Sequence, residues 1–171
     1  MHVRTAVAIA ALLVACSQGG GHPSFYVRIS GRLPPISGRP LSGGRIEPSK
    51  YQGKVVVINF WNPSCPPCRQ EQPVLEEAWE RLRGRIYMIG VVYTGGNWPS
   101  DREAAREHLR KFGVTYPNLL DASSRLPRAV GVRGIPTTVI ADAAGRLRFE
   151  VLGRLRPGQI QTLVSLLRPA A

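Results

Sequence analysis

The chain has 171 residues, of which 43% are hydrophobic and 20% are charged, so it has room for one domain with a sizeable core. This composition is that of an ordinary globular protein and excludes a disordered chain or a disulfide-stapled scaffold. The formal net charge of +12 suggests nucleic acid or an anionic membrane as a partner. The basic residues are scattered, however, and form no run of five or six like charges. A general preference for Arg over Lys explains the charge more simply, and we expect no binding of nucleic acid.

The first fifteen residues predict the signal peptide of a bacterial lipoprotein. A short start containing Arg4 precedes a wholly apolar stretch at residues 6–15, which is too short to span a bilayer but suits a secretory signal. The end of that stretch, Leu13-Val14-Ala15-Cys16, resembles a lipobox, whose cysteine becomes the lipidated N-terminus. Residues 16–24 are then expected to form a flexible tether. The alternative is an ordinary signal peptide with an incidental cysteine.

Both alternatives predict export, and a lipid on Cys16 would hold the mature protein on the bacterial cell membrane. The extracytoplasmic side of that membrane is where disulfide chemistry is possible.

Residues 25–171 predict a single domain, because no linker and no internal repeat divides them. Residues 25–29 predict a short strand, and residues 30–49, rich in Gly, Pro and Ser, predict turns or a loose hairpin. Val55 to Trp61 is a run of β-branched and aromatic residues around Asn59, which is typical of a strand buried on both faces. A helix is predicted from Pro66 to Arg83, since apolar residues recur on one of its faces.

Further along the chain, strands and helices alternate before a final hairpin and helix. We expect strands at 86–94, 116–120, 137–141 and 147–152, and helices at 100–112, 123–130 and 157–167. Ser100 is the expected N-cap of its helix, with Glu103 completing a capping box. Alternation of this kind predicts an α/β fold in which helices cover both faces of a central sheet.

Cys65 and Cys68 form a C-x-x-C sequence, which has three interpretations: half of a zinc site, a structural crosslink or a redox pair. A zinc ion needs about four ligands, and the chain has no second C-x-x-C and no paired histidines. A crosslink over so short a loop would stabilise little of the chain. A redox pair therefore explains the cysteines best, and we expect no metal and no cofactor.

The pair follows the predicted buried strand and opens the predicted helix, with Cys65 at the N-cap, the exposed end of that helix. There the helix macrodipole stabilises the thiolate, which is the nucleophilic form. An N-cap side chain accepts from the second or third helical residue, but Pro66 and Pro67 have no N–H. The donors that remain are chiefly the N–H and S–H of Cys68. We therefore expect a thiolate that is stabilised less than in a pair with free amides between its cysteines.

The motifs that identify a family are Val57-Ile58-Asn59-Phe60-Trp61, Cys65-Pro66-Pro67-Cys68, Glu71, Pro73 and Gly134-Ile135-Pro136-Thr137-Thr138. Together they resemble the TlpA/ResA-like branch of the thioredoxin superfamily, and the resemblance covers roughly residues 25–168. It implies a thioredoxin-like fold, with a central mixed sheet flanked by helices and an N-terminal β extension. It also implies that Cys65 attacks a substrate disulfide and that Cys68 resolves the mixed disulfide.

The resemblance implies roles for further residues. Pro136 matches a cis-proline that lies against the cysteine pair, which would leave the backbone of Ile135 free to bind an extended substrate chain. The alternative is an ordinary trans proline at the start of a strand. Glu71 matches an acidic residue near the active site, where a partly buried carboxyl exchanges a proton with the resolving thiol. The alternative is a solvated charge. Asn59 replaces a buried Asp of cytoplasmic thioredoxins, so that proton relay is absent, and Ser64 replaces a bulky Trp at the rim.

The sequence thus predicts an extracytoplasmic, membrane-anchored thiol–disulfide oxidoreductase that acts as a disulfide reductase. The resemblance implies protein disulfides as substrates, apocytochrome c among them, and a membrane dithiol carrier as the electron donor. We expect a monomer. Two alternatives stay open: a thiol-dependent peroxidase of the redoxin group, and a lipoprotein binding module that keeps the fold without the activity. The peroxidase would need a threonine three positions before the attacking cysteine, where Asn62 stands.

Overall fold

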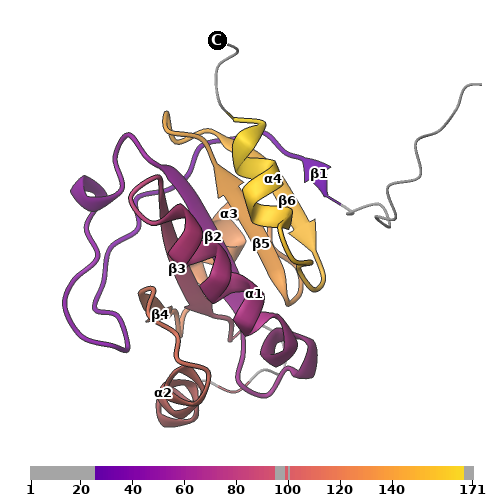
Figure 1. Ribbon diagram of the computed structural model, residues 1–171. Helices are drawn as coiled ribbons and strands as arrows, with labels where there is room; N and C mark the ends of the chain where they lie inside the picture. The colour runs from indigo at the N-terminus through magenta and orange to yellow at the C-terminus, as the bar shows by residue number, and fades with distance from the viewer. Residues whose placement is uncertain (1–25, 95–98, 100, 168–171) are drawn as a thin grey trace, which may run out of the picture.

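The computed structural model describes residues 26–94, 99 and 101–167. A mixed sheet of six strands forms its centre, in the order β1-β6-β5-β2-β3-β4 (Figure 1). The strands are β1 Val27–Arg28, β2 Val55–Trp61, β3 Ile86–Val92, β4 Asn118–Leu120, β5 Thr137–Ala141 and β6 Leu147–Leu152. β2, β3 and β4 are parallel to one another. On the other side of β2 the pairs are antiparallel: β5 pairs with β2, β6 with β5 and β1 with β6. The predicted strands and the mixed sheet are confirmed.

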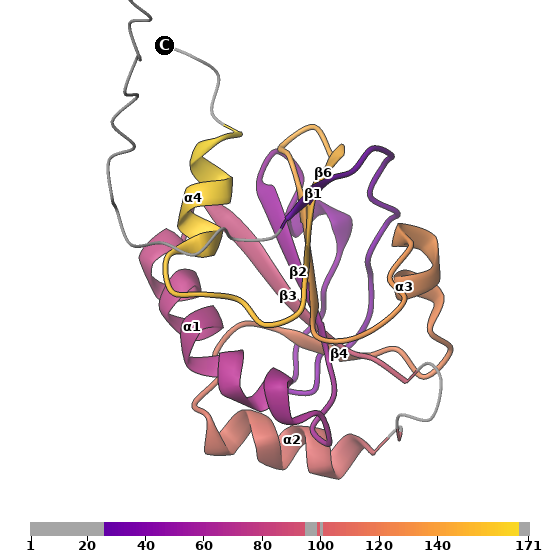
Figure 2. The ribbon, with the colours of Figure 1, turned by 90° about the vertical axis from the view of Figure 1, so that its right-hand side faces the viewer.

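Helices cover both faces of this sheet, as predicted. They are the α-helices α1 Pro66–Leu82, α2 Arg102–Lys111, α3 Arg125–Val130 and α4 Gln159–Ser165, and the 3-10 helix η1 Pro48–Lys50. Figure 2 shows α1 and α4 on one face of the sheet and α3 on the other. In both views α2 lies at the end of the molecule that holds β4 and the N-terminal end of α1.

β2 is buried on both faces because its side chains alternate between two cores. Val56, Ile58 and Phe60 belong to a cluster that includes Val130 of α3. Val57 belongs to a second cluster, formed with residues of α1 and α4. The predicted doubly buried strand is confirmed, and the alternation places Asn59 and Trp61 on the α1 side.

The N-terminal segment before β2 is part of the domain. Gly38 and Ile46 form an antiparallel bridge, which is the predicted loose hairpin. At its tip the N–H of Leu41 donates to the carbonyl of Asn118 at 2.7 Å. This contact brings the buried Leu41 side chain against the cluster around the cysteine pair.

The N-cap of α2 is Asp101, whose carboxylate accepts from the N–H of Ala104 at 2.9 Å. We expected Ser100 in this role, and Ser100 itself lies outside the described residues. The helix starts one residue later than the sequence pattern suggests. Asp is as good an N-cap as Ser, so the sequence fits either start. Its predicted end is confirmed, since Phe112 is the C-cap and Gly113 follows with φ 61°.

The predicted signal peptide and tether, residues 1–24, lie outside the described residues, and so does Cys16. In the part of the chain that the structure describes, no helix has the length and apolar character needed to cross a bilayer.

Candidate functional site

The cysteine pair joins β2 to α1. Cys65 and Cys68 form a disulfide with their Cα atoms 5.3 Å apart. Cys65 is the N-cap of α1, with an extended backbone, and Pro66 and Pro67 occupy the first two helical positions. The N–H of Cys68 donates to the sulfur of Cys65 at 3.3 Å. This is the donor that the sequence predicts.

Both cysteines are buried in this oxidised form, with exposed fractions of 1% for Cys65 and 0% for Cys68. Our expectation that Cys65 stands at an exposed helix end is therefore wrong for the disulfide state. The physical reason is a third apolar cluster in which Trp61 and two residues of α2, Ala105 and Leu109, surround the pair. The exposed rim consists of small residues around the pair, namely Ser64, Pro66 and Pro67.

The loop between β2 and the pair is held by the side chain of Asn62. Its amide nitrogen donates to the carbonyls of Tyr93 and Pro99 at 2.9 and 3.0 Å, and its oxygen accepts from the N–H of Ser64 at 3.0 Å. All of the amide's bonds go to the backbone, so Asn62 shapes the loop that presents Cys65.

Glu71 lies one turn after Cys68 on α1 and is fully buried. One carboxylate oxygen accepts from the side-chain amide of Asn59 at 2.8 Å, and the other accepts from the N–H of Leu155 at 2.9 Å. Burial raises the pKa of Glu71 from 4.5 to about 7, although these two hydrogen bonds and the positive charge of Arg154 act in the opposite direction. A carboxyl with this pKa changes its charge near neutral pH, as a general acid or base must. The alternative of a solvated charge is wrong.

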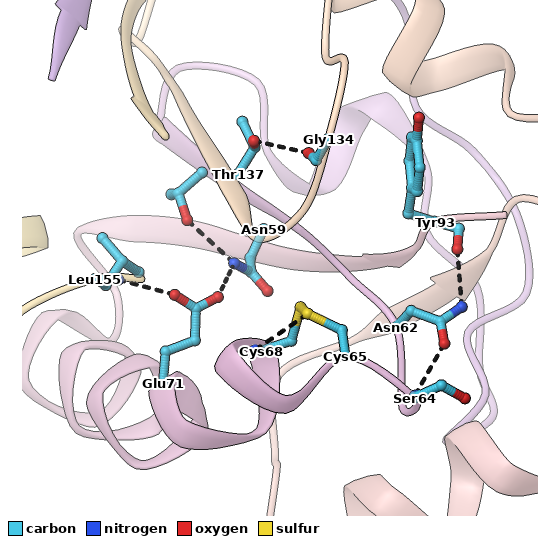
Figure 3. The surroundings of a disulfide bond; sticks show 11 residues. Asn59, Asn62, Ser64, Cys65, Cys68, Glu71, Tyr93, Gly134, Thr137 and Leu155 are labelled. Carbon is cyan, nitrogen blue, oxygen red and sulfur yellow. Dashed lines mark hydrogen bonds between the residues drawn. A yellow bond between two sulfur atoms is a disulfide. The ribbon is translucent and has the colours of Figure 1, made fainter. Parts of the chain in front are cut away.

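Asn59 lies between Glu71 and the disulfide (Figure 3). Its amide nitrogen also donates to the hydroxyl of Thr138 at 3.1 Å. An ionisable carboxyl therefore does lie beneath the pair: α1 supplies it at Glu71, and Asn59 of β2 holds it in place.

The peptide bond between Ile135 and Pro136 is cis, as the motif predicts. Pro136 is buried and Ile135 is half-buried. Among the described residues, no hydrogen bond engages the backbone N–H or carbonyl of Ile135. The hydroxyl of Thr137 donates to the carbonyl of Gly134 at 2.8 Å and so closes the loop on its other side.

Sequence reasoning missed three residues that shape the site. Thr138 and Leu155 hold Asn59 and Glu71 through hydrogen bonds between segments far apart in the chain, for which a sequence contains no local signal. The third is His108, whose ring centroid lies 4.7 Å from the ring centroid of Trp61. Burial lowers the pKa of His108 from 6.5 to about 4, and the positive charges of Arg69 and Lys111 act in the same direction. At neutral pH the imidazole is therefore uncharged.

Within the described part of the chain, no group of three or more His, Cys, Asp or Glu residues is placed to hold a metal ion.

A comparison with protein families identifies the chain. The AhpC/TSA family matches residues 29–150. The protein belongs to the AhpC/TSA family. It is a thiol–disulfide oxidoreductase of the ResA type, and the predicted resemblance and enzyme class are confirmed.

Individual relatives agree with this assignment. The thiol–disulfide oxidoreductase ResA of Bacillus subtilis is 28% identical over 153 residues, which are 90% of this chain and 77% of that protein. Among solved structures, a DsbF homologue from Corynebacterium diphtheriae has a TM-score of 0.72 at 23% identity, covering 88% of this chain and 96% of that one. An exposed lipoprotein thioredoxin of Streptococcus pneumoniae has a TM-score of 0.69 at 24% identity, covering 78% and 100%. These likenesses confirm the thioredoxin-like fold.

Proposed function

We propose that this thiol–disulfide oxidoreductase is a disulfide reductase that acts outside the cytoplasm while a lipid on Cys16 holds it on the membrane. The observation that carries the exchange chemistry is Glu71, while the direction of electron flow is proposed from Pro66 and Pro67, which remove backbone donors to the Cys65 thiolate. A fully buried carboxyl whose pKa is raised to about 7 lies one helical turn from Cys68. Such a group takes up a proton from the resolving thiol near neutral pH.

The catalytic cycle starts with Cys65 as the nucleophile. The Cys65 thiolate attacks one sulfur of a substrate disulfide, and the other sulfur leaves as a thiolate, so that a mixed disulfide links Cys65 to the substrate. Cys68 then loses its proton to the Glu71 carboxylate and attacks the Cys65 sulfur. The second substrate sulfur leaves, and the Cys65–Cys68 disulfide forms. Two electrons have passed to the substrate, and a dithiol carrier in the membrane restores the pair.

The loop before β5 is proposed to bind the substrate chain. The backbone N–H and carbonyl of Ile135 have no partner among the described residues, and a strand-like segment of a substrate can pair with them. Pro136 carries no N–H, so it adds no backbone donor next to those of Ile135. Substrate recognition through backbone atoms suits an enzyme whose substrates are protein disulfides of differing sequence.

The N-terminal sequence and the relatives support the proposed location and partners. The lipobox-like Leu13 to Cys16 supports lipidation, and a structural relative is an exposed lipoprotein. The proposed chain architecture is a signal at residues 1–15, a tether at residues 16–24 and a thioredoxin-like domain at residues 25–171. The proposed substrates are protein disulfides, with apocytochrome c as the specific candidate, and the proposed working unit is the monomer.

The peroxidase alternative is less well supported. The position that would carry a threonine is Asn62, whose amide group is used in three hydrogen bonds to the loop backbone. A binding module without activity leaves the buried, raised-pKa carboxyl one helical turn from Cys68 without a role.

Trapping of mixed disulfides tests the proposal. Cys68→Ser should accumulate mixed disulfides with protein partners on non-reducing gels, because Cys65 can attack but nothing resolves the product. Cys65→Ser is the matched control and should accumulate none. Equal trapping by the two variants would overturn the assignment of roles. Alkylation of the reduced protein adds a second test, since a binding module would keep its function after alkylation and a reductase would lose it.

A further inference from the structure

The side-chain oxygen of Asn59 is a buried hydrogen-bond acceptor without a partner among the described residues. The orientation of the amide is fixed, because its nitrogen donates to Glu71 at 2.8 Å and to Thr138 at 3.1 Å. Both N–H bonds are therefore used, and a rotated amide would direct its oxygen at the Glu71 carboxylate. With Glu71 ionised, the unpaired atom is therefore Oδ1, and not a nitrogen that could be exchanged with it.

This oxygen is on the side of the amide that faces the cysteine pair. In Figure 3 the Asn59 nitrogen points at Glu71, while the oxygen points toward the disulfide. A disulfide sulfur carries no hydrogen, so it has nothing to donate to Oδ1. A buried acceptor left unpaired destabilises the state that contains it.

We propose that Oδ1 of Asn59 accepts a hydrogen bond from the S–H of Cys68 when the pair is reduced, which makes Asn59 a positioning residue for the resolving thiol. Cys68 is the sulfur concerned because it shares a helix face with Glu71, three residues later on α1, and Glu71 holds the other end of the same amide. A thiol is a weak donor, but it is a donor. The inference rests on the proposed role of Cys68 as the resolving cysteine.

Reduction creates the missing donor. A dithiol partner breaks the Cys65–Cys68 bond and delivers two electrons and two protons, so that each sulfur gains a hydrogen and the partner becomes a disulfide. The hydrogen on Cys68 then pairs with Oδ1. Asn59 thus favours the reduced state, in which its acceptor is satisfied, over the oxidised state, in which it is not.

The same bond makes the two thiols unequal. Donation to Asn59 holds Cys68 in its thiol form, so Cys65 is left as the nucleophile that meets the substrate. When the mixed disulfide forms, Cys68 must release its proton, and the Glu71 carboxylate that receives it is bonded to the same amide. Asn59 therefore aligns the thiol with its base without carrying a proton itself.

A spectroscopic test uses the native side chains in the full-length Cys16→Ser chain, which lacks lipid. The ¹³Cγ resonance of Asn59 should move downfield on reduction, because its oxygen gains a hydrogen bond. Asn118 is the internal control, since its oxygen already accepts from the indole N–H of Trp61 at 2.9 Å. A shift of Asn59 no larger than that of Asn118 would overturn the proposal, and this test depends on no substitution at Asn59.

A thermodynamic test compares two substitutions around the same amide. Asn59→Leu removes the unpaired acceptor, so the equilibrium constant for disulfide formation in glutathione buffer should rise about tenfold, equivalent to about 30 mV toward a more reducing potential. Thr138→Val removes a partner of Asn59 but leaves Oδ1 in place, and should change the constant less than about twofold.

Equal shifts in the two variants, or a shift of Asn59→Leu toward a more oxidising potential, would contradict the proposal. Both measurements use the isolated protein and no protein substrate. A failure here therefore leaves the trapping experiment with Cys68→Ser intact, and a failure of trapping leaves these two readouts intact.

Discussion

The buried carboxylate of Glu71 accepts a hydrogen bond from the side-chain amide of Asn59 at 2.8 Å, and this contact joins helix α1 to strand β2 beneath the cysteine pair. Burial is the larger influence on Glu71, because its pKa stands at about 7 in spite of two hydrogen bonds and a nearby arginine. The folded protein therefore binds this proton more tightly than the unfolded chain does. We therefore expect the stability of the fold to depend on pH through this group.

Glu71→Gln should remove a pH dependence of stability. With a pKa of 4.5 unfolded and about 7 folded, Glu71 stabilises the fold fully below pH 4.5. That contribution, roughly 3 kcal/mol, is lost as the pH rises to 7 and beyond. The glutamine does not titrate, but its amide nitrogen faces one of the two N–H donors, which costs about 1–3 kcal/mol at every pH. Denaturant unfolding of the oxidised protein should therefore show a less stable variant at pH 5 and a smaller or reversed difference at pH 8.

Glu77→Gln is the matched control, because Glu77 lies on the same helix but is half exposed and paired with Arg81 at 2.8 Å. It should keep the pH dependence of the wild type. A Glu71→Gln variant whose free energy of unfolding still falls between pH 5 and pH 8 like that of the wild type would rule out the raised pKa.

The parts of this site that the sequence predicts are those set by local chemistry. β2 is visible as a run of apolar residues interrupted only by Asn59, and the donor to the Cys65 sulfur follows from the two prolines that lack N–H groups. The burial of Glu71 is not visible in this way. It depends on Leu155, which is 84 positions away along the chain, and on β2, so only the assembled fold determines whether the carboxyl is solvated.

The N-cap of α2 is a second feature that the sequence alone does not decide. Ser100 and Asp101 are both good N-caps, so the sequence around them fits a helix that starts at either position. The structure has Asp101 at the cap. Burial of Cys65 was also beyond local reasoning, because Leu41, Ala105 and Leu109, which surround the pair, come from two separate segments.

Gly90→Ala should destabilise the domain next to the site. Gly90 of β3 pairs with Asn118 of β4, and a Cβ at residue 90 would lie 1.7 Å from the Asn118 side-chain oxygen. Asn118 must then move and lose the indole N–H of Trp61. We expect a loss of roughly 1–3 kcal/mol together with a changed Trp fluorescence spectrum. Gly134→Ala, in open space, is the control, and an equal loss of stability in both variants would contradict the clash.

Cys16→Ser tests the anchor. If Cys16 carries the multiple acyl chains of a bacterial lipoprotein, the native protein should stay with membranes through a high-salt wash, because two hydrophobic anchors bind stably where one does not. The variant should appear in the soluble fraction or remain unprocessed. Cys68→Ser is the control and should stay with the membrane. Release of the native protein by salt would instead point to attraction of its basic residues to anionic lipid.

We expect the Cys65–Cys68 pair to be a reductant, with a low reduction potential. Strong oxidants of this kind owe their potential to a highly stabilised thiolate, and the Cys65 sulfur here receives the N–H of Cys68 at 3.3 Å while Pro66 and Pro67 offer none. His108 adds no charge at neutral pH, since its pKa is about 4. We expect a midpoint nearer to about −270 mV, as in thioredoxin, than to about −120 mV. Equilibration in glutathione buffers, read as the fraction of Cys65–Cys68 disulfide, measures it.

Two proline substitutions test whether the missing N–H groups of Pro66 and Pro67 set the reduction potential. Pro67 is the second helical residue, whose N–H is in the position to reach an N-cap side chain, so Pro67→Ala should stabilise the Cys65 thiolate and make the pair more oxidising. Pro66 is the first helical residue, and Pro66→Ala restores an N–H outside that position, so it should shift the potential less. Equal shifts in the two variants would show that the missing donor is not the cause.

A wild-type midpoint more oxidising than about −180 mV, the value for protein disulfide isomerase, would make the protein an oxidase or isomerase and not a reductase.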